Sequence, residues 1–145
     1  MTTTAISATI PEQFHAFLAE PRTAVLTIGR GPDRPPHATP VWFNFEQGRF
    51  ELSITRTRAK YRHLQRAPEV SLVIDDTLGY RTVIVEGRAE VTDDDASLLA
   101  LAKKLRAKYR VGQPSPPDGE ILRGLRAEER IVVTVAPQKV LSWAR

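Results

Sequence analysis

The chain has 145 residues, of which 41% are hydrophobic and 26% charged, a size and composition that suit one folded domain and argue against long disorder. It contains no cysteine, which excludes disulfides, thiolate nucleophiles and zinc–thiolate sites. The formal net charge of +4 is mild, but basic residues concentrate over 53–68, and such a local positive field favours a small polyanionic ligand.

The sequence gives no sign of a membrane or metal association. No apolar run approaches the roughly 20 residues that span a bilayer. The N-terminal MTTTAISATI lacks the positive and apolar regions of a signal peptide. The histidines His15, His37 and His63 show no metal-ligand spacing. We therefore expect a cytoplasmic protein with no membrane partner and no metal site.

Hydrophobic periodicity, broken by turns rich in Gly and Pro, predicts the secondary structure. The pattern favours helices over 11–20, 58–67, 93–110 and 120–126, and strands over 23–29, 37–45, 49–55, 69–75, 80–92, 130–137 and 139–143. Because short turns join the strands between residues 23 and 55, these strands are expected to form an antiparallel meander. Gly87 interrupts the longest strand and is expected to mark a bulge or bend.

The order of these elements indicates the fold class. Six or seven strands and two to four helices do not alternate as strand–helix repeats. We therefore expect a mainly β (α+β) fold, a small antiparallel barrel with helices in its crossovers, and not a doubly wound sheet. No linker, internal repeat or low-complexity run divides the chain, so residues 1–145 are expected to form one domain.

No self-contained catalytic motif is present. The sequence lacks GxSxG, GxGxxG and GxxxxGK[ST], which argues against a nucleophile elbow, a Rossmann fold and a P-loop. The paired carboxylates Asp75 and Asp76, and the acidic run 93–95, fall at a strand end and a helix start, where turn and cap roles account for them. The remaining candidate is the strand-to-helix junction at 53–60.

The stretch SITRTRAK, residues 53–60, joins an alternating strand to a helix. A helix start offers unpaired N–H groups and partial positive charge, which suit an anion. Arg58 and Lys60 add a planar fork and a point charge, and Ser53 and Thr55 project hydroxyl groups from one face of the strand. This pattern predicts a small phosphate socket, with ordinary solvated surface cations as the alternative.

Several segments follow one another in a characteristic order and spacing. They are TAVLTI, PHATPVWFNFE, LSITRTRAKYRHLQRAP, SLVIDD, GYRTVIVEGRAEV and ERIVVTVAPQKVLSW. This order resembles the pyridoxamine-phosphate-oxidase-like split barrels, and more narrowly the actinobacterial branch that uses the deazaflavin coenzyme F420. The resemblance covers nearly the whole chain. It implies a split β-barrel that forms a homodimer, with two cofactor clefts between the subunits.

The resemblance also implies how the cofactor phosphate is held. Arg58 and Lys60 correspond to the basic residues that grip the phosphate, and Ser53 and Thr55 lie beside them. His63 follows Lys60 by one helical turn and is a candidate for the edge of the same cleft.

The rest of the implied cleft involves two further segments. Thr39, Pro40 and Val41 correspond to the strand that lies along the cofactor ring system. Tyr80 and Arg81 are the candidates for residues that close the cleft from the partner subunit, and Tyr80 is the candidate proton donor. Trp42, in contrast, is expected to be a core or interface anchor.

The implied activity is hydride transfer from reduced F420 to an unsaturated small-molecule acceptor, such as an enone, a quinone or a tetrapyrrole. One alternative keeps the fold but binds FMN, as an oxidase or flavin reductase. A second alternative is a non-catalytic carrier of F420 or a flavin. A nucleic-acid module is disfavoured because only Tyr61 interleaves with the basic residues.

Overall fold

The computed structural model describes residues 3–56 and 59–145. Its elements in chain order are β1 (Thr3–Ser7), the 3-10 turn η1 (Glu12–Phe14), α1 (His15–Ala19), β2 (Ala24–Ile28), β3 (His37–Val41), β4 (Phe43–Glu46), β5 (Arg49–Thr55), α2 (Ala59–Arg66), β6 (Glu69–Asp75), β7 (Arg81–Thr92), α3 (Asp95–Tyr109), α4 (Asp118–Ala127) and β8 (Arg130–Ala144). Within the described ranges, all strands belong to one antiparallel sheet in the order β3-β2-β6-β7-β8-β5-β4, with β1 added beside β8.

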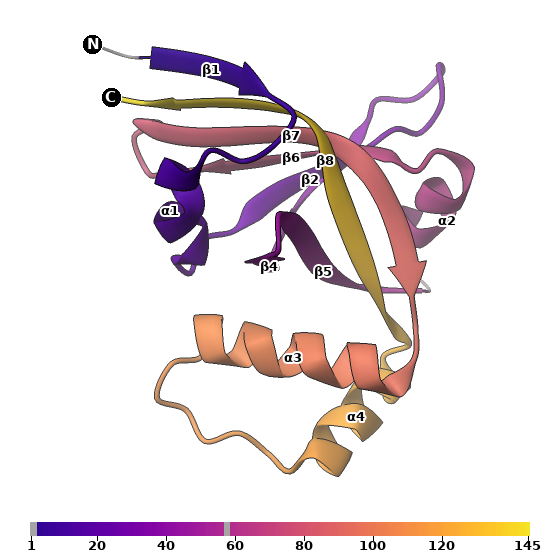
Figure 1. The fold of residues 1–145 in the computed structure, drawn as a ribbon. Helices are drawn as coiled ribbons and strands as arrows, with labels where there is room; N and C mark the ends of the chain where they lie inside the picture. Colours follow the sequence, from indigo (N-terminus) through magenta and orange to yellow (C-terminus); the bar gives the residue numbers. More distant parts are fainter. Residues whose placement is uncertain (1–2, 57–58) are drawn as a thin grey trace.

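The sheet curls into an incomplete barrel (Figure 1). The inner face buries the main core, whose largest fully buried side chains include Phe14, Phe43, Phe50, Leu18 and Leu72. Helices α3 and α4 lie together below β5 and the first half of β8 (Figure 1), over a second apolar cluster that contains Leu98, Leu101, Leu105 and Val132. The mainly β split-barrel architecture expected from the sequence is confirmed.

The long strands β7 and β8 form the back of the barrel and bend together at Gly87. The pairing register shifts between Glu86 and Gly87, opposite Pro137. A Cβ atom added at Gly87 would overlap the carbonyl oxygen of Ala136 and lie 2.9 Å from Cγ1 of Val135. The bend predicted at Gly87 is confirmed, and its cause is the close approach of the facing backbone.

The stretch 37–45, expected to be one strand, is two strands separated by Trp42. β3 pairs with β2, whereas β4 pairs with β5, so the two lie at opposite edges of the sheet. The simple meander is therefore wrong, because the chain crosses the open seam of the barrel at this residue. β3 and β4 are therefore neighbours in the sequence, joined by Trp42, but they do not pair with each other.

The two ends of the chain also differ from expectation. Thr3–Ser7 forms β1, an additional strand that pairs with the second half of β8. The segments 130–137 and 139–143, expected as separate strands, are the single strand β8, whose first half pairs with β5. Because β8 is long and bent, its first half can pair with β5 on one side of the barrel and its second half with β1 on the other.

Three of the four expected helices lie within two residues of their expected bounds, and the first is shorter. Asp94 caps α3, with its carboxylate accepting a hydrogen bond from the Ser97 N–H at 3.0 Å. The predicted first helix is shorter than expected and begins as a 3-10 turn after Pro11, with no side-chain cap. No helix in the described ranges is long and apolar enough to cross a membrane.

Candidate functional site

A pocket of about 460 Å³ lies between the curled sheet and α3. Strands β3, β5 and β8 supply its sheet side, and α3 supplies the facing wall, with further contributions from α2 and the end of α4. The pocket therefore opens where the barrel is split.

Most of the residues predicted to bind a cofactor converge on this pocket. They are Thr39, Pro40, Val41, Ser53, Thr55 and Lys60. The two strand segments meet because Phe43 pairs with Leu52, which places the residues just before Phe43 beside those just after Leu52. Arg58 lies outside the described residues, so its role stays a prediction.

Thr55 is a buried polar residue of the pocket lining. The residue is 8% exposed, and its Oγ1 has no hydrogen-bond partner among the described residues. Buried hydroxyl groups are normally hydrogen-bonded, so this atom is a candidate for a contact with a water, a ligand or a further part of the chain. Ser53 lies two residues earlier, on the same face of β5. Ser53 and Thr55 both line the pocket.

The lining of the pocket carries an excess of positive charge. Its cations are Lys60, Arg106, Arg110 and Arg130, and its carboxylate is Glu128. Arg130 pairs with Glu128 at 2.7 Å and also donates to the carbonyl oxygen of Ser53 at 3.4 Å. With four cations against one carboxylate, the lining as a whole favours an anionic ligand.

Sequence reasoning missed one complete wall of the pocket. The buried α3 residues Leu98, Leu101 and Leu105 form its apolar part. Trp42 also lines the pocket and is 41% exposed, so it is not a core residue. The available signal was the alternation of Val41, Phe43 and Phe45 in the sequence, which in an extended chain places Trp42 on the opposite face.

The C-terminal end of α3 is fastened to the barrel by two half-buried polar side chains. Lys108 Nζ donates to the carbonyl oxygens of Leu18 at 2.7 Å and Phe43 at 2.9 Å. The Tyr109 hydroxyl accepts from the Phe43 N–H at 3.1 Å and donates to the Arg22 carbonyl oxygen at 2.6 Å. Burial lowers the pKa of Lys108 to about 8. These bonds fix the distance between α3 and the sheet, and so the width of the pocket.

His63 does not line this pocket. It is 7% exposed, on α2. Burial lowers its pKa, and the nearby Arg34, Arg30 and Arg66 lower it further. The side chain is therefore kept neutral beside a basic group of residues, and its expected place at the cleft edge is not seen within one chain.

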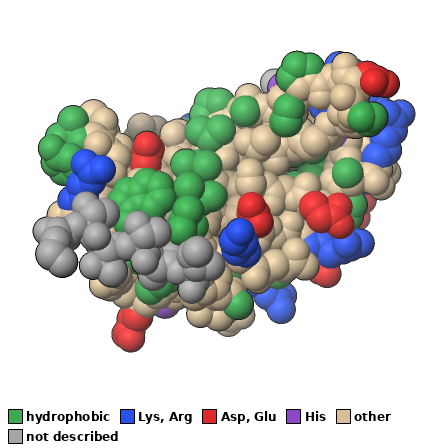
Figure 2. Space-filling view, turned by 90° about the horizontal axis from the view of Figure 1, so that it is seen from above, with side chains coloured by type: hydrophobic (Ala, Val, Ile, Leu, Met, Phe, Trp, Pro, Cys, Tyr) green, Lys and Arg blue, Asp and Glu red, His purple; other side chains and the backbone are tan. Residues whose placement is uncertain are grey.

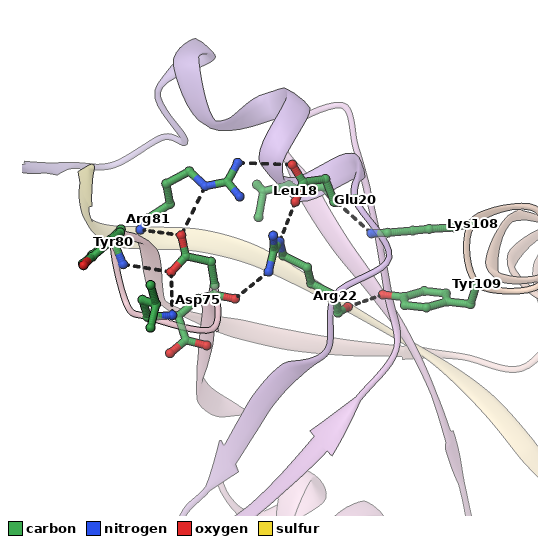
Figure 3. Close-up of polar contacts among 10 residues, drawn as sticks. Leu18, Glu20, Arg22, Asp75, Tyr80, Arg81, Lys108 and Tyr109 are labelled. Carbon is green, nitrogen blue, oxygen red and sulfur yellow. Dashed lines mark hydrogen bonds and ion pairs between the residues drawn. The ribbon is translucent and has the colours of Figure 1, made fainter. Parts of the chain in front are cut away.

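Tyr80 and Arg81 also lie away from the pocket, at the turn between β6 and β7. The Arg81 guanidinium pairs with Glu20 at 3.2 Å and with Asp76 at 3.3 Å (Figure 3). Burial alone would raise the pKa of Asp76, but hydrogen bonds from the Tyr80 N–H and from Arg81 outweigh it and lower that pKa. Arg81 thus has a structural role in its own chain. The contribution of either residue to a partner's cleft stays a prediction.

The curled antiparallel sheet, with a pocket at its seam, defines a split β-barrel protein. Residues 10–144 match the family model described as pyridoxamine 5'-phosphate oxidase. This chain therefore belongs to the pyridoxamine 5'-phosphate oxidase family, as the order of its segments predicted.

Individual relatives share most of the chain. It is 27% identical over 129 residues to an F420H2-dependent biliverdin reductase of Mycobacterium tuberculosis, which covers 89% of this chain and 85% of that protein. A solved structure named F420 reductase is 26% identical, with a TM-score of 0.70, over 90% of this chain and 98% of the other. A solved structure of a conserved hypothetical protein from Mycobacterium tuberculosis supports the fold. It is 24% identical, with a TM-score of 0.78, over 95% of this chain and 88% of the other.

Proposed function

We propose that this protein is an F420H2-dependent reductase that acts on an unsaturated small-molecule acceptor. The observation that carries the proposal is the convergence of Thr39, Pro40, Val41, Ser53, Thr55 and Lys60 on one pocket. Two relatives at 26–27% identity, one named an F420H2-dependent biliverdin reductase and the other an F420 reductase, support deazaflavin as the cofactor class.

The residues of the pocket fit a phosphate-bearing tricyclic cofactor. A volume of about 460 Å³ falls within the roughly 300–1,000 Å³ typical of small-molecule sites. Lys60 and the hydroxyl-bearing residues Ser53 and Thr55, which all line the pocket, suit a phosphate. The apolar surface of Pro40, Val41 and Leu101 suits a flat ring.

When bound, reduced F420 supplies the hydride for the acceptor. The chain itself contributes binding, orientation and exclusion of water. Thr55 and Ser53 donate hydrogen bonds to the anionic group, and Lys60 compensates its charge. The buried leucines of α3 keep water from the opposite side of the pocket. Tyr80 would deliver a proton only from a second subunit, because it lies outside this pocket in its own chain.

The proposal includes a homodimer, and the outer face of the sheet supports it. Directly paired residues on neighbouring strands form one apolar row, Pro40, Val25, Val73, Ile84 and Leu141. Residues flanking the row, such as Leu72 and Val83, are fully buried, so the row points away from the core. Figure 2 shows hydrophobic side chains gathered on the β7–β8 side, at the end where the termini lie. Because Pro40 belongs to both the row and the pocket, a second copy seated there would border the pocket.

An Ile84→Glu protein is expected to be monomeric, because a carboxylate in the middle of the apolar row cannot be buried without a partner. Sedimentation or light scattering of the purified proteins measures this. Val91→Glu is the matched control, since Val91 is an exposed apolar residue of the same strand outside the row, and it should remain dimeric. A monomeric parent protein would contradict the dimer, as would a dimeric Ile84→Glu protein that retains the native circular dichroism.

The cofactor is tested by titrating the purified protein into F420 and following the deazaflavin fluorescence, with FMN titrated in parallel. We expect F420 to bind more tightly than FMN, and F420H2 to be oxidised when an enone, quinone or tetrapyrrole acceptor is added. Tight FMN binding without an F420 response would favour the FMN-dependent alternative. Binding of F420 without turnover of any of these acceptors would favour a carrier.

A further inference from the structure

An exposed aromatic side chain stands at one end of the pocket. Trp42 is stacked on Tyr109, with the ring centroids 4.6 Å apart and the planes within 2° of parallel. The guanidinium carbon of Arg110 lies 5.8 Å from the centre of the Trp42 ring. We call Trp42, Tyr109, Arg106 and Arg110 the Trp42 platform.

The Trp42 platform is held in place because the Tyr109 side chain, on which Trp42 stacks, is hydrogen-bonded to two segments of backbone. The Tyr109 hydroxyl bonds to the backbone of Phe43 and Arg22, as described above. Trp42 itself is held between Val41 and Phe43, both of which are buried. An indole that is 41% exposed and yet held in place offers a flat contact surface at little cost in side-chain entropy.

Two guanidinium groups border this aromatic surface. Arg106 and Arg110 are one helical turn apart, at the end of α3, and both line the pocket. No carboxylate within residues 3–56 and 59–145 forms a salt bridge with either of them, whereas Arg130, elsewhere in the same pocket, is paired with Glu128. A guanidinium fork matches the geometry of a carboxylate.

The Trp42 platform and Thr55 lie toward opposite ends of the pocket. The pocket follows α3 from Leu98 to Arg110, about 18 Å at 1.5 Å per residue. Thr55 belongs to the other end of α3, because its neighbour Arg56 pairs at 2.7 Å with Asp93, just before that helix begins. The end of the pocket at Trp42 therefore combines an aromatic face with cations, whereas Thr55 lies toward the other end.

We propose that the Trp42 platform binds the acceptor, and that it selects flat, conjugated molecules that carry a carboxylate. The conjugated part stacks along the Trp42 indole, and the carboxylate pairs with Arg110 and Arg106. This inference rests on the proposed function for its reaction, but the binding step requires no cofactor. It narrows the acceptor class, because a carboxylate gains charge-assisted hydrogen bonds from the two guanidinium groups that an uncharged enone or quinone does not.

The test uses biliverdin as a flat conjugated dicarboxylate, and biliverdin dimethyl ester as its uncharged counterpart. The chain has two tryptophans, so a Trp143→Phe protein reports binding through Trp42 emission alone. In the absence of F420, biliverdin should quench this emission saturably, and the dimethyl ester should bind at least about tenfold more weakly, the loss expected for a charged hydrogen bond.

Two variants and one control complete the test, with equilibrium dialysis as the readout. Trp42→Leu and Arg110→Ala should each weaken biliverdin binding by about tenfold or more. Arg123→Ala removes an exposed arginine of α4 that does not line the pocket, and it should bind biliverdin like the parent. Equal binding of acid and ester, or unchanged affinity in both Trp42→Leu and Arg110→Ala, would overturn the inference.

Titrating F420 into the same proteins separates the two proposals. If the parent protein binds F420 but neither variant loses biliverdin affinity, the platform inference fails and the proposed function stands. If the parent ignores F420 but binds biliverdin through Trp42 and Arg110, the proposed function fails and the platform stands.

Discussion

A Lys60→Ala protein is expected to bind F420 about ten- to a hundredfold more weakly than the parent, because one charge-assisted hydrogen bond to the phosphate is lost. The measurement is the change in deazaflavin fluorescence during titration. Lys103→Ala is the matched control: Lys103 is an exposed lysine of α3 that pairs with Asp118 and lies outside the pocket lining. We expect this control to bind F420 like the parent.

Thr55→Val tests the same phosphate site without removing a charge. The Thr55 hydroxyl has no partner among the described residues, so its replacement by a methyl group should leave the melting temperature unchanged or raise it. Weaker F420 binding in this variant would then reflect a lost contact to the ligand. If both Lys60→Ala and Thr55→Val bound F420 like the parent, the phosphate would have to lie elsewhere.

Gly87→Ala is expected to lower the free energy of unfolding by about 2–3 kcal/mol and the melting temperature by about 5–10 °C. The added Cβ would meet the backbone carbonyl of Ala136 and Cγ1 of Val135. A backbone atom held in the β7–β8 ladder cannot move aside cheaply, so the two long strands would have to separate.

Gly124→Ala is the control for this change. Gly124 lies in α4 with open space around the position of a Cβ, and alanine favours a helix interior by roughly 1 kcal/mol over glycine. Thermal melts of the two variants should therefore shift in opposite directions. A Gly87→Ala protein as stable as the parent would show that the bend at this residue tolerates a side chain.

The sequence was sufficient to predict one side of the pocket. Residues 49–55 alternate so clearly that Ser53 and Thr55 had to share a face, and Lys60 follows at the next helix start. Thr39, Pro40 and Val41 were found through the resemblance to a family, since nothing in their side chains alone distinguishes them from an ordinary strand. All of them do line the pocket.

The other side of the pocket depends on contacts that are distant in sequence. α3 is predicted as a helix by its capping aspartate and leucine spacing, but its position opposite β5 is set by Lys108 and Tyr109, which bond to backbone atoms 65–90 residues away. The local sequence pattern of a helix does not predict contacts with residues so distant in the chain. Arg106 and Arg110 therefore looked like ordinary cations at a helix end.

A second limit on prediction from the sequence concerns Tyr80, Arg81 and His63. Their expected roles concern a cleft that a second subunit completes, and one chain does not contain that cleft. Arg81 already has two carboxylate partners, Glu20 and Asp76, in its own chain (Figure 3). Any contact that it makes with a ligand would therefore be shared with this network.

Pro40 has a consequence for how the protein behaves in a crowded solution. It lies in β3, which forms one margin of the sheet and, within residues 3–56 and 59–145, has a hydrogen-bonded neighbour strand only on the β2 side. A bare strand margin is a template on which another polypeptide can add a strand and begin aggregation. Proline lacks the N–H group that such pairing needs. Pro40, which also lines the pocket, thus interrupts the row of N–H groups on this strand, and the margin resists strand addition.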